Sequence, residues 1–195
     1  MGAKHLIVVG GLVPPLLAPD AADAHQGSAD IDLCLSVAIV HGATREYCRS
    51  IEEHLDPWFE LMSPSGFRLT RIRHAGPVGF LAAKADALDG RDDPKDGYDV
   101  AWWCLNAAAR PMDVAELVLT RPAFAHPLFQ ESVALLQRAF RAPDYPGPDG
   151  YARELHPHLE AGDELYELAR NAAYASVAAV IELLVPRLWD GGAAR

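Results

Sequence analysis

A strand that runs into two glycines is the feature that most constrains what this chain can fold into. The short apolar stretch Lys4–Val9 predicts a buried strand, which is ended by Gly10-Gly11. A second strand is expected over Asp30–Ala38, directly after Gly27-Ser28. Glycines let backbone N–H groups approach a phosphate, and a serine hydroxyl adds a further donor. The order of these segments therefore predicts a phosphate-binding turn beside two strands.

The second strand opens with two carboxylates, Asp30 and Asp32. Residues two apart in a strand point to the same side, so both carboxylates share one face, and Ile31 and Leu33 share the other. Two adjacent carboxylates repel unless a cation lies between them. Such oxygen ligands suit Mg²⁺ that substrate phosphates also hold. We expect a nucleotide–metal site with Asp30 and Asp32 as ligands; the alternative is an edge strand with two solvated aspartates.

The bulk composition is that of a soluble globular protein of one domain or two small ones. The 195 residues carry a formal net charge of −10, which excludes DNA binding through general electrostatic attraction. The three cysteines form no CxxC pair, so neither a disulfide framework nor a zinc site is indicated. Free thiols in a reducing cytoplasm are expected.

The N-terminus also permits a different interpretation. Met1–Ala24 superficially resembles a signal peptide, because Lys4 precedes an apolar run that ends in Ala-Ala-Asp-Ala. Glycine and proline pairs interrupt that run, and two aspartates precede any plausible cleavage point, so a cytoplasmic protein is favoured over an exported helical one. No membrane span is expected, since the apolar stretch Ala172–Val185 is too short and contains Glu182.

Turn residues and hydrophobic periodicity divide the chain into two parts. Up to residue 75, we expect helices over Leu12–Ala18 and Gly42–Pro57 and strands over Phe59–Met62 and Phe67–Arg73. After Gly76-Pro77 the pattern is helical, with helices expected over Val78–Leu88, Lys95–Ala109, Pro111–Leu119, His126–Phe140 and Asp163–Trp189. Arg141–Gly150 is expected to be a linker or an ordered loop. We predict an α+β fold, with residues 1–75 as a small α/β core and residues 76–195 as a helical region.

The array Gly-Gly … Gly-Ser-x-Asp-x-Asp closely resembles the signature of the nucleotidyltransferase fold, also called polymerase-beta-like. The resemblance implies a small mixed sheet with flanking helices, followed here by a helical C-terminal half. It also implies that the glycine and serine turns, at Gly10, Gly11, Gly27 and Ser28, hold the phosphates of an NTP. Asp30 and Asp32 would carry two metal ions, Mg²⁺ or Mn²⁺, that activate the attacking oxygen and stabilise the pyrophosphate leaving group.

A downstream segment narrows the resemblance. Lys84-Ala-Asp86-Ala-Leu88-x-x-Arg91-x-x-x-Lys95-Asp96-x-x-Asp99 is similar to a motif of the AbiEii- and AbiGii-type nucleotidyltransferases, a toxin-related branch of that superfamily. The likeness covers about the first 105 residues. It implies that Lys84, a sound point-charge partner for phosphate, contacts the triphosphate. It also implies that the acceptor is RNA, in particular tRNA, and that an antitoxin protein is a partner.

The residues of this segment also have structural interpretations. Lys84 fits a surface position on a helix whose buried stripe is Leu81, Ala85 and Leu88. The charged residues that follow fit a solvated ion-pair network at a helix start, capped by Asp93 or Asp96: Arg91, Lys95, Asp96 and Asp99. For Arg91 and Asp96 this structural role is favoured over catalysis. His25, which precedes the Gly27-Ser28 turn, is expected near the phosphates.

The chain departs from the family in a respect that bears on activity. Members carry a third carboxylate on a neighbouring strand, whereas Phe67–Arg73 contains none and Glu60 is the one acid near an expected strand. This departure indicates a shortened member. The leading prediction is a metal-dependent nucleotidyltransferase that moves a nucleotidyl group from an NTP to an acceptor hydroxyl. The alternative is a catalytically degenerate relative that binds nucleotide or a protein partner.

Overall fold

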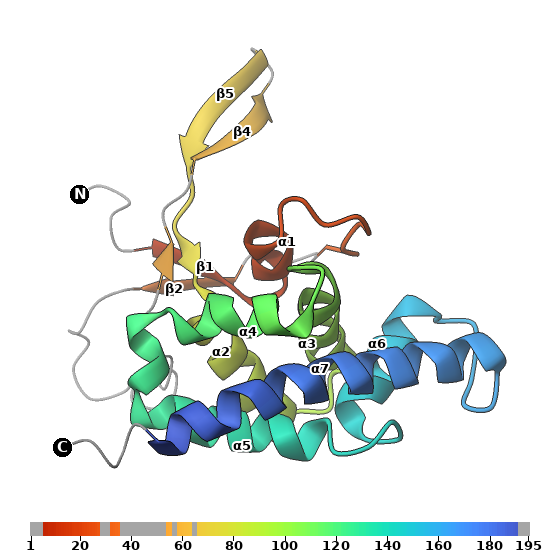
Figure 1. Cartoon of the computed structure of the whole chain (residues 1–195). Helices are drawn as coiled ribbons and strands as arrows, with labels where there is room; N and C mark the ends of the chain where they lie inside the picture. Colours follow the sequence, from red (N-terminus) through yellow and green to blue (C-terminus); the bar gives the residue numbers. More distant parts are fainter. Residues whose placement is uncertain (1–5, 28–31, 36–53, 56–57, 64–65, 191–195) are drawn as a thin grey trace.

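A computed structural model of the chain describes residues 6–27, 32–35, 54–55, 58–63 and 66–190. Within these ranges the fold is mixed α+β, with helices in the majority, as the sequence predicts (Figure 1). The strands come first along the chain and lie to one side, and the helices that follow gather in one bundle.

Four short strands form the sheet that carries the predicted phosphate turn. Their order is β2 (Asp32–Leu35), β1 (Leu6–Val9), β6 (His74–Ala75) and β3 (His54–Leu55). Strand β1 pairs antiparallel with β2 and parallel with β6. Strands β1 and β2 confirm the two strands predicted beside the glycines, although residues 30–31 and 36–38 of the second lie outside the described ranges.

The helix predicted over Gly42–Pro57 falls mostly outside the described residues. Its described end, His54–Leu55, is strand β3, so the prediction is wrong there. The physical reason is tertiary: the backbone of His54–Leu55 pairs antiparallel with β6, and sheet hydrogen bonds override a local helical pattern.

A separate hairpin consists of β4 (Trp58–Ser63) and β5 (Gly66–Arg71), which pair antiparallel with each other. It confirms the strands predicted over these segments, except that β5 ends at Arg71 rather than Arg73. Figure 1 shows the hairpin projecting away from the helices. Glu60 lies opposite Leu69 within this hairpin and therefore belongs to a different sheet from Asp32.

The helices begin where proline occupies the first or second helical position, a place where the missing N–H costs no hydrogen bond. This holds for α1 to α6. The helices predicted over Leu12–Ala18 and after residue 76 are confirmed with small shifts at their ends, and α6 was not predicted. The helices are α1 (Val13–Leu17), α2 (Pro77–Gly90), α3 (Pro94–Asn106), α4 (Pro111–Leu119), α5 (Pro127–Ala139), α6 (Pro146–Leu155) and α7 (Glu164–Asp190), with 3-10 turns over Gly10–Leu12 and Pro122–Ala125.

Helix α6 corrects the prediction of a linker or loop over Arg141–Gly150, because its first half lies in that stretch. Pro146 occupies the first helical turn, and Gly150 faces α3. A Cβ at Gly150 would lie 2.5 Å from the Pro94 carbonyl oxygen. The prolines and glycines that are typical of loops here begin a helix and let it approach α3 closely.

Helix α7 corrects the expectation that no stretch is long and apolar enough to cross a membrane. It continues through Pro186, and Glu164–Trp189 has sufficient length and contains an 18-residue window with a mean hydropathy of 1.4. A core helix of a soluble protein has the same composition, and Ala173, Val177 and Val180 of α7 are buried. The length and composition of α7 are therefore only a weak indication of a membrane span.

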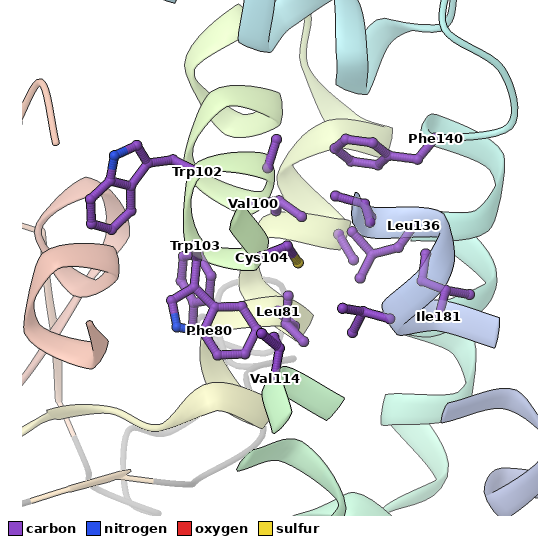
Figure 2. Close-up of a cluster of buried hydrophobic side chains, with 14 of the residues drawn as sticks. Phe80, Leu81, Val100, Trp102, Trp103, Cys104, Val114, Leu136, Phe140 and Ile181 are labelled. Atoms are coloured by element: carbon purple, nitrogen blue, oxygen red, sulfur yellow. The ribbon is translucent and has the colours of Figure 1, made fainter. Parts of the chain in front are cut away.

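The core runs without a break from the N-terminal elements into the helices, since Val13 of α1 and Ala75 of β6 belong to the same buried cluster as α2 to α7. Figure 2 shows Phe80 and Trp103 side by side in this cluster, with ring centroids 5.8 Å apart and an edge-to-face arrangement. Trp102, the preceding residue on α3, belongs to the same cluster, and its ring is turned toward the N-terminal segment. The division of the chain at residue 75 stays a prediction.

Candidate functional site

The β1–β2 register brings the two predicted phosphate and metal segments together. Val9, the last residue of β1, pairs with Asp32, so the backbone of Asp32 lies opposite the residue that precedes Gly10. Gly10 has φ +73, in the left-handed region that favours glycine, and Gly11 is buried. Ser28 and Asp30 lie outside the described residues. The glycine turn and the start of β2 are thus neighbours, as the motif reading requires.

The loop that leads to β2 is fastened to α3 by hydrogen bonds. His25 Nε2 lies 3.0 Å from Asp99 Oδ1, and the Gly27 N–H donates to His25 Nδ1 at 2.9 Å. The Gln26 N–H donates to Tyr98 Oη at 3.1 Å. The His25 ring also packs against Tyr98 and Trp102, with centroids 5.1 and 4.7 Å away. The backbone just before Ser28 is therefore held by α3, although the two are far apart in sequence.

Lys84 connects the same part of α3 to α2. Its ammonium lies 2.7 Å from Asp96 Oδ1 and 2.6 Å from Asp99 Oδ2. The Lys84 side chain is 7% exposed and both carboxylates are fully buried. Arg91, at the end of α2, donates to both oxygens of Asp96, at 2.7 and 2.9 Å. We call Lys84, Asp96, Asp99, His25 and Arg91 the buried charge network.

Two cations and two carboxylates balance within the buried charge network, which lets Lys84 and the two carboxylates lie in a low-dielectric interior, whereas the Arg91 side chain is 59% exposed and reaches Asp96 from the surface. Burial opposes the charged form of Lys84, but the carboxylates of Asp99 and Asp96 outweigh it and raise the pKa of Lys84 above its ordinary value of 10.5. Burial also favours protonation of Asp96, but its bonds from Arg91 and Lys84 outweigh this and hold the pKa of Asp96 below 3.8. Both groups are charged at neutral pH.

The lowered pKa of Asp96 predicts a loss of stability in acid. The unfolded chain binds a proton at this position more readily than the folded chain, so the contribution of Asp96 is present above pH 3.8 and is lost as pH falls through the folded-state pKa. Between about pH 4.5 and about pH 2.5, the slope of the unfolding free energy against pH should be smaller for Asp96→Asn than for the wild type. The difference should correspond to the uptake of up to about one proton on unfolding. Urea unfolding at several pH values measures this slope.

The matched control for that experiment is Asp144→Asn, which removes an exposed carboxylate. Its slope should equal that of the wild type. If Asp96→Asn and Asp144→Asn give the same slope, Asp96 carries no linked proton and the explanation by the buried charge network is wrong.

The sequence placed Lys84, Asp96 and Asp99 in one motif but did not predict their burial. The alternative of an exposed Lys84 on a helix surface is wrong, and so is that of a solvated network, since Asp96 and Asp99 are inaccessible. Asp93, not Asp96, caps α3 by accepting the Lys95 N–H. Contact between Lys84 and a triphosphate stays a prediction.

Asp99 as the partner of His25 is the connection that sequence reasoning missed. Asp99 belongs to the motif that contains Lys84, and His25 precedes the phosphate turn. Nothing in the sequence indicates that a hydrogen bond joins His25 to Asp99 across 74 residues. The available signal was the i, i+3 spacing of Asp96 and Asp99, which puts both carboxylates on one face of α3.

A groove of about 530 Å³ opens beside the network, between the end of α2 and the starts of α3 and α6. Its lining contains two guanidinium groups, Arg91 and Arg153, and five carboxylates: Asp89, Asp92, Asp93, Asp144 and Asp149. The excess of negative charge makes it a poor receptor for a triphosphate. Within the described ranges, no group of three or more His, Cys, Asp or Glu side chains is arranged to hold a metal ion.

Comparison with known proteins identifies no family for this chain. The chain matches no protein-family model, no curated protein and no solved structure. The nucleotidyltransferase resemblance therefore stays a prediction that rests on the motifs quoted above.

Proposed function

We propose that this chain is a metal-dependent nucleotidyltransferase that moves a nucleotidyl group from an NTP to an acceptor hydroxyl. One observation supports the proposal: segments that the motifs mark for one chemistry, though distant in the sequence, lie beside one another in two pairs. Gly10-Gly11 adjoins Asp32 through the β1–β2 register. The His25–Gly27 loop is bonded to Asp99, which in turn binds Lys84. Convergence of distant, chemically matched segments is what an active site requires.

In this proposal the carboxylates of Asp30 and Asp32 hold Mg²⁺ or Mn²⁺, whose preference for oxygen ligands fits this pair. The metal would supply Lewis-acid stabilisation of charge on the phosphates. Backbone N–H groups at Gly10 and Gly11, with the Ser28 hydroxyl, orient the phosphates, while Gly27, whose N–H is bonded to His25, shapes the turn that leads to Ser28. Gly10 and Gly27 both have positive φ, at +73 and +79, a backbone conformation that residues with a side chain rarely adopt.

Lys84 has two tasks in the proposal. An ammonium has three N–H donors, and the described contacts direct two of them to Asp96 and Asp99. One donor is left for a phosphate oxygen. The same bonds tie α2 to α3 and so support the loop that leads to Ser28. Lys84 therefore acts both as a positive charge near the triphosphate and as a link between the helices.

A second candidate function is nucleotide or partner binding without turnover. The observation that favours it is the separation of the β4–β5 hairpin from the sheet that carries Asp32. Glu60 lies on that hairpin, opposite Leu69, and β5 carries no acidic residue. Neither β4 nor β5 therefore provides a third carboxylate on a strand beside Asp32.

The acceptor and the setting rest on the resemblance alone. RNA, in particular tRNA, is the proposed acceptor, an antitoxin protein is the proposed partner, and the cytoplasm is the proposed location. A protein of net charge −10 would meet RNA through a local basic surface rather than through its overall charge.

Thermal unfolding with each NTP, with and without Mg²⁺, tests the proposed site. At a nucleotide concentration of about 100 times Kd, binding should stabilise the fold by about 2.7 kcal/mol, which raises Tm by about 5–10 °C. Asp30→Asn combined with Asp32→Asn should abolish this Mg²⁺-dependent rise. Without nucleotide, the double variant should unfold at the wild-type temperature or slightly above it, because a repulsion is removed.

The matched control is Asp20→Asn combined with Asp23→Asn, which removes the same charge from two exposed positions of the preceding loop. The control should keep the full nucleotide-dependent rise in Tm. If the Asp30 and Asp32 variant unfolds by itself, those aspartates are structural and the site assignment fails. If it responds to Mg²⁺ and NTP as the wild type does, they are not the metal ligands.

A further inference from the structure

His25 uses both nitrogens of its ring, each toward a different element. Nε2 lies 3.0 Å from Asp99 Oδ1 on α3, and Nδ1 accepts the Gly27 N–H at 2.9 Å. The side chain is 1% exposed, so water does not compete for either nitrogen. The imidazole is a bridge between a buried carboxylate and the backbone of the phosphate turn.

These two partners define the protonation state of the bridge. Because the Gly27 N–H donates to Nδ1, that nitrogen carries no proton, and Nε2–H must be the donor to Asp99. The bridge is therefore made by the neutral imidazole. An imidazolium has N–H donors at both positions, so Nδ1–H would face the Gly27 N–H with no acceptor between them. Protonation thus breaks the bond to Gly27 while keeping the bond to Asp99.

The bond to Gly27 bears on the turn directly. Gly27 has φ +79, and no atom lies within 4 Å of the place where its Cβ would be, so this side of the turn makes no packing contact with the described residues. Among the described residues, the polar contacts at the turn are the His25–Gly27 bond, the bond from the Gln26 N–H to Tyr98 Oη and the bond from the Gln26 side chain to the Glu154 carbonyl. Ser28 follows in the sequence, so the conformation of Gly27 sets where the chain toward β2 begins.

We propose that His25 is a positioning residue that fixes the Gly27 turn only as a neutral imidazole, and that acidification therefore releases the turn and weakens nucleotide binding. Only the second half of this inference, the weakening of nucleotide binding, rests on the proposed function. The first half, the pH-dependent fixing of Gly27, stands on the described contacts.

The charged and titratable groups around His25 come from α3, α2, α6 and its own loop. Asp99 of α3 bonds to Nε2, and Lys84 of α2 binds Asp99 at 2.6 Å. Tyr98 lies against the ring from α3 and stacks on Tyr151 of α6. Further out, Glu154 of α6 accepts from Gln26 through its backbone carbonyl, and Asp23 belongs to the same loop as His25. Histidine is the side chain whose charge ordinarily changes between about pH 5 and about pH 8.

Two substitutions separate the two nitrogens. His25→Asn keeps an acceptor near the position of Nδ1, in the geometry in which asparagine accepts the N–H two residues on. His25→Gln places an amide donor near the position of Nε2 and keeps the bond to Asp99. Neither side chain titrates. The two variants therefore test which ring nitrogen holds Gly27 and whether a change of charge on the side chain is needed. If the ring had only a structural role, the two variants would protect the Gly27 amide equally.

Hydrogen exchange of the Gly27 amide, measured by NMR as a protection factor at about pH 8 and about pH 5, is the readout. The wild type should lose about tenfold in protection on acidification. His25→Asn should keep its protection at both pH values, and His25→Gln should lack it at both. The ¹⁵N shifts of the wild-type imidazole should report the Nε2–H form at about pH 8. They answer the question without any variant, should one fail to fold.

The inference is overturned if the wild-type Gly27 amide keeps its protection at about pH 5, or if the ring is in the Nδ1–H form. It is equally overturned if His25→Asn loses protection with acid as the wild type does. The affinity for Mg²⁺ and ATP, measured on the same samples, separates the two proposals. If Gly27 responds as expected but ATP does not bind at either pH, the proposed function fails and the control of the turn by His25 stands. If ATP binds equally at both pH values while Gly27 responds, the regulatory half of the inference fails.

Discussion

Lys84→Met should lower the free energy of unfolding by about 3–5 kcal/mol, the usual cost of removing one partner from a buried ion pair. The ammonium lies 2.7 Å from Asp96 and 2.6 Å from Asp99, and both carboxylates are inaccessible to water. Methionine fills the space of the lysine stem but leaves Asp99 with no cation from the part of the chain that the structure describes. Arg91 still binds Asp96, so most of the loss should arise at Asp99. Urea unfolding at pH 7 measures the effect.

Lys95→Met is the matched control, because Lys95 lies on the neighbouring helix α3 and its side chain makes no ion pair with the described residues. It should change stability by no more than about 0.5 kcal/mol. Adding Asp99→Asn to Lys84→Met should recover part of the loss, since the unpaired charge is removed. If Lys84→Met costs no more than Lys95→Met, the pair contributes nothing and the network is not what joins α2 to α3.

The second large effect concerns chemistry rather than stability. Asp30→Asn should lower the rate of nucleotidyl transfer by about 10³-fold or more, because loss of a metal ligand removes several kcal/mol of transition-state stabilisation. The initial rate of pyrophosphate release, with Mg²⁺, NTP and a tRNA mixture as acceptor, measures this loss. Circular dichroism confirms that the variant is folded.

Asp20→Asn serves again as the control, since it removes an exposed carboxylate ten residues upstream. It should retain transfer within about twofold, as expected for a surface substitution away from a site. Equal rates for Asp30→Asn and the wild type would remove Asp30 from the metal site. Equal losses for Asp30→Asn and Asp20→Asn would indicate a general charge effect instead.

The helical half of the fold could be predicted because its signals are local. Apolar periodicity is written in the sequence, and a proline lies at the starts of α2 to α5, so these helices and α7 were predicted with shifts of a few residues at their ends. Helix α6 was missed because Pro146, Gly147 and Gly150 are also loop residues. Only the close approach to α3 explains why they are helical here.

The parts that could not be predicted depend on contacts between distant segments. His54–Leu55 is a strand because β6 lies beside it, and no local pattern reports that neighbour. Burial of Lys84 and Asp99 depends on how α2 packs against α3, and the bond from His25 to Asp99 depends on how the N-terminal loop lies on α3. Sequence motifs identified most of these residues, whereas the interactions among them required the fold.

The most direct test of the account is the position of the label after reaction. The wild-type protein would be incubated with Mg²⁺, a tRNA mixture and each NTP in turn, labelled at either the α- or the γ-phosphate. Nucleotidyl transfer predicts that α-label becomes attached to the RNA and that γ-label leaves in pyrophosphate. Attachment of γ-label would contradict the account, because it identifies phosphoryl transfer. Attachment of neither label, together with a Mg²⁺-dependent rise in Tm, would identify a nucleotide-binding protein that has lost the reaction.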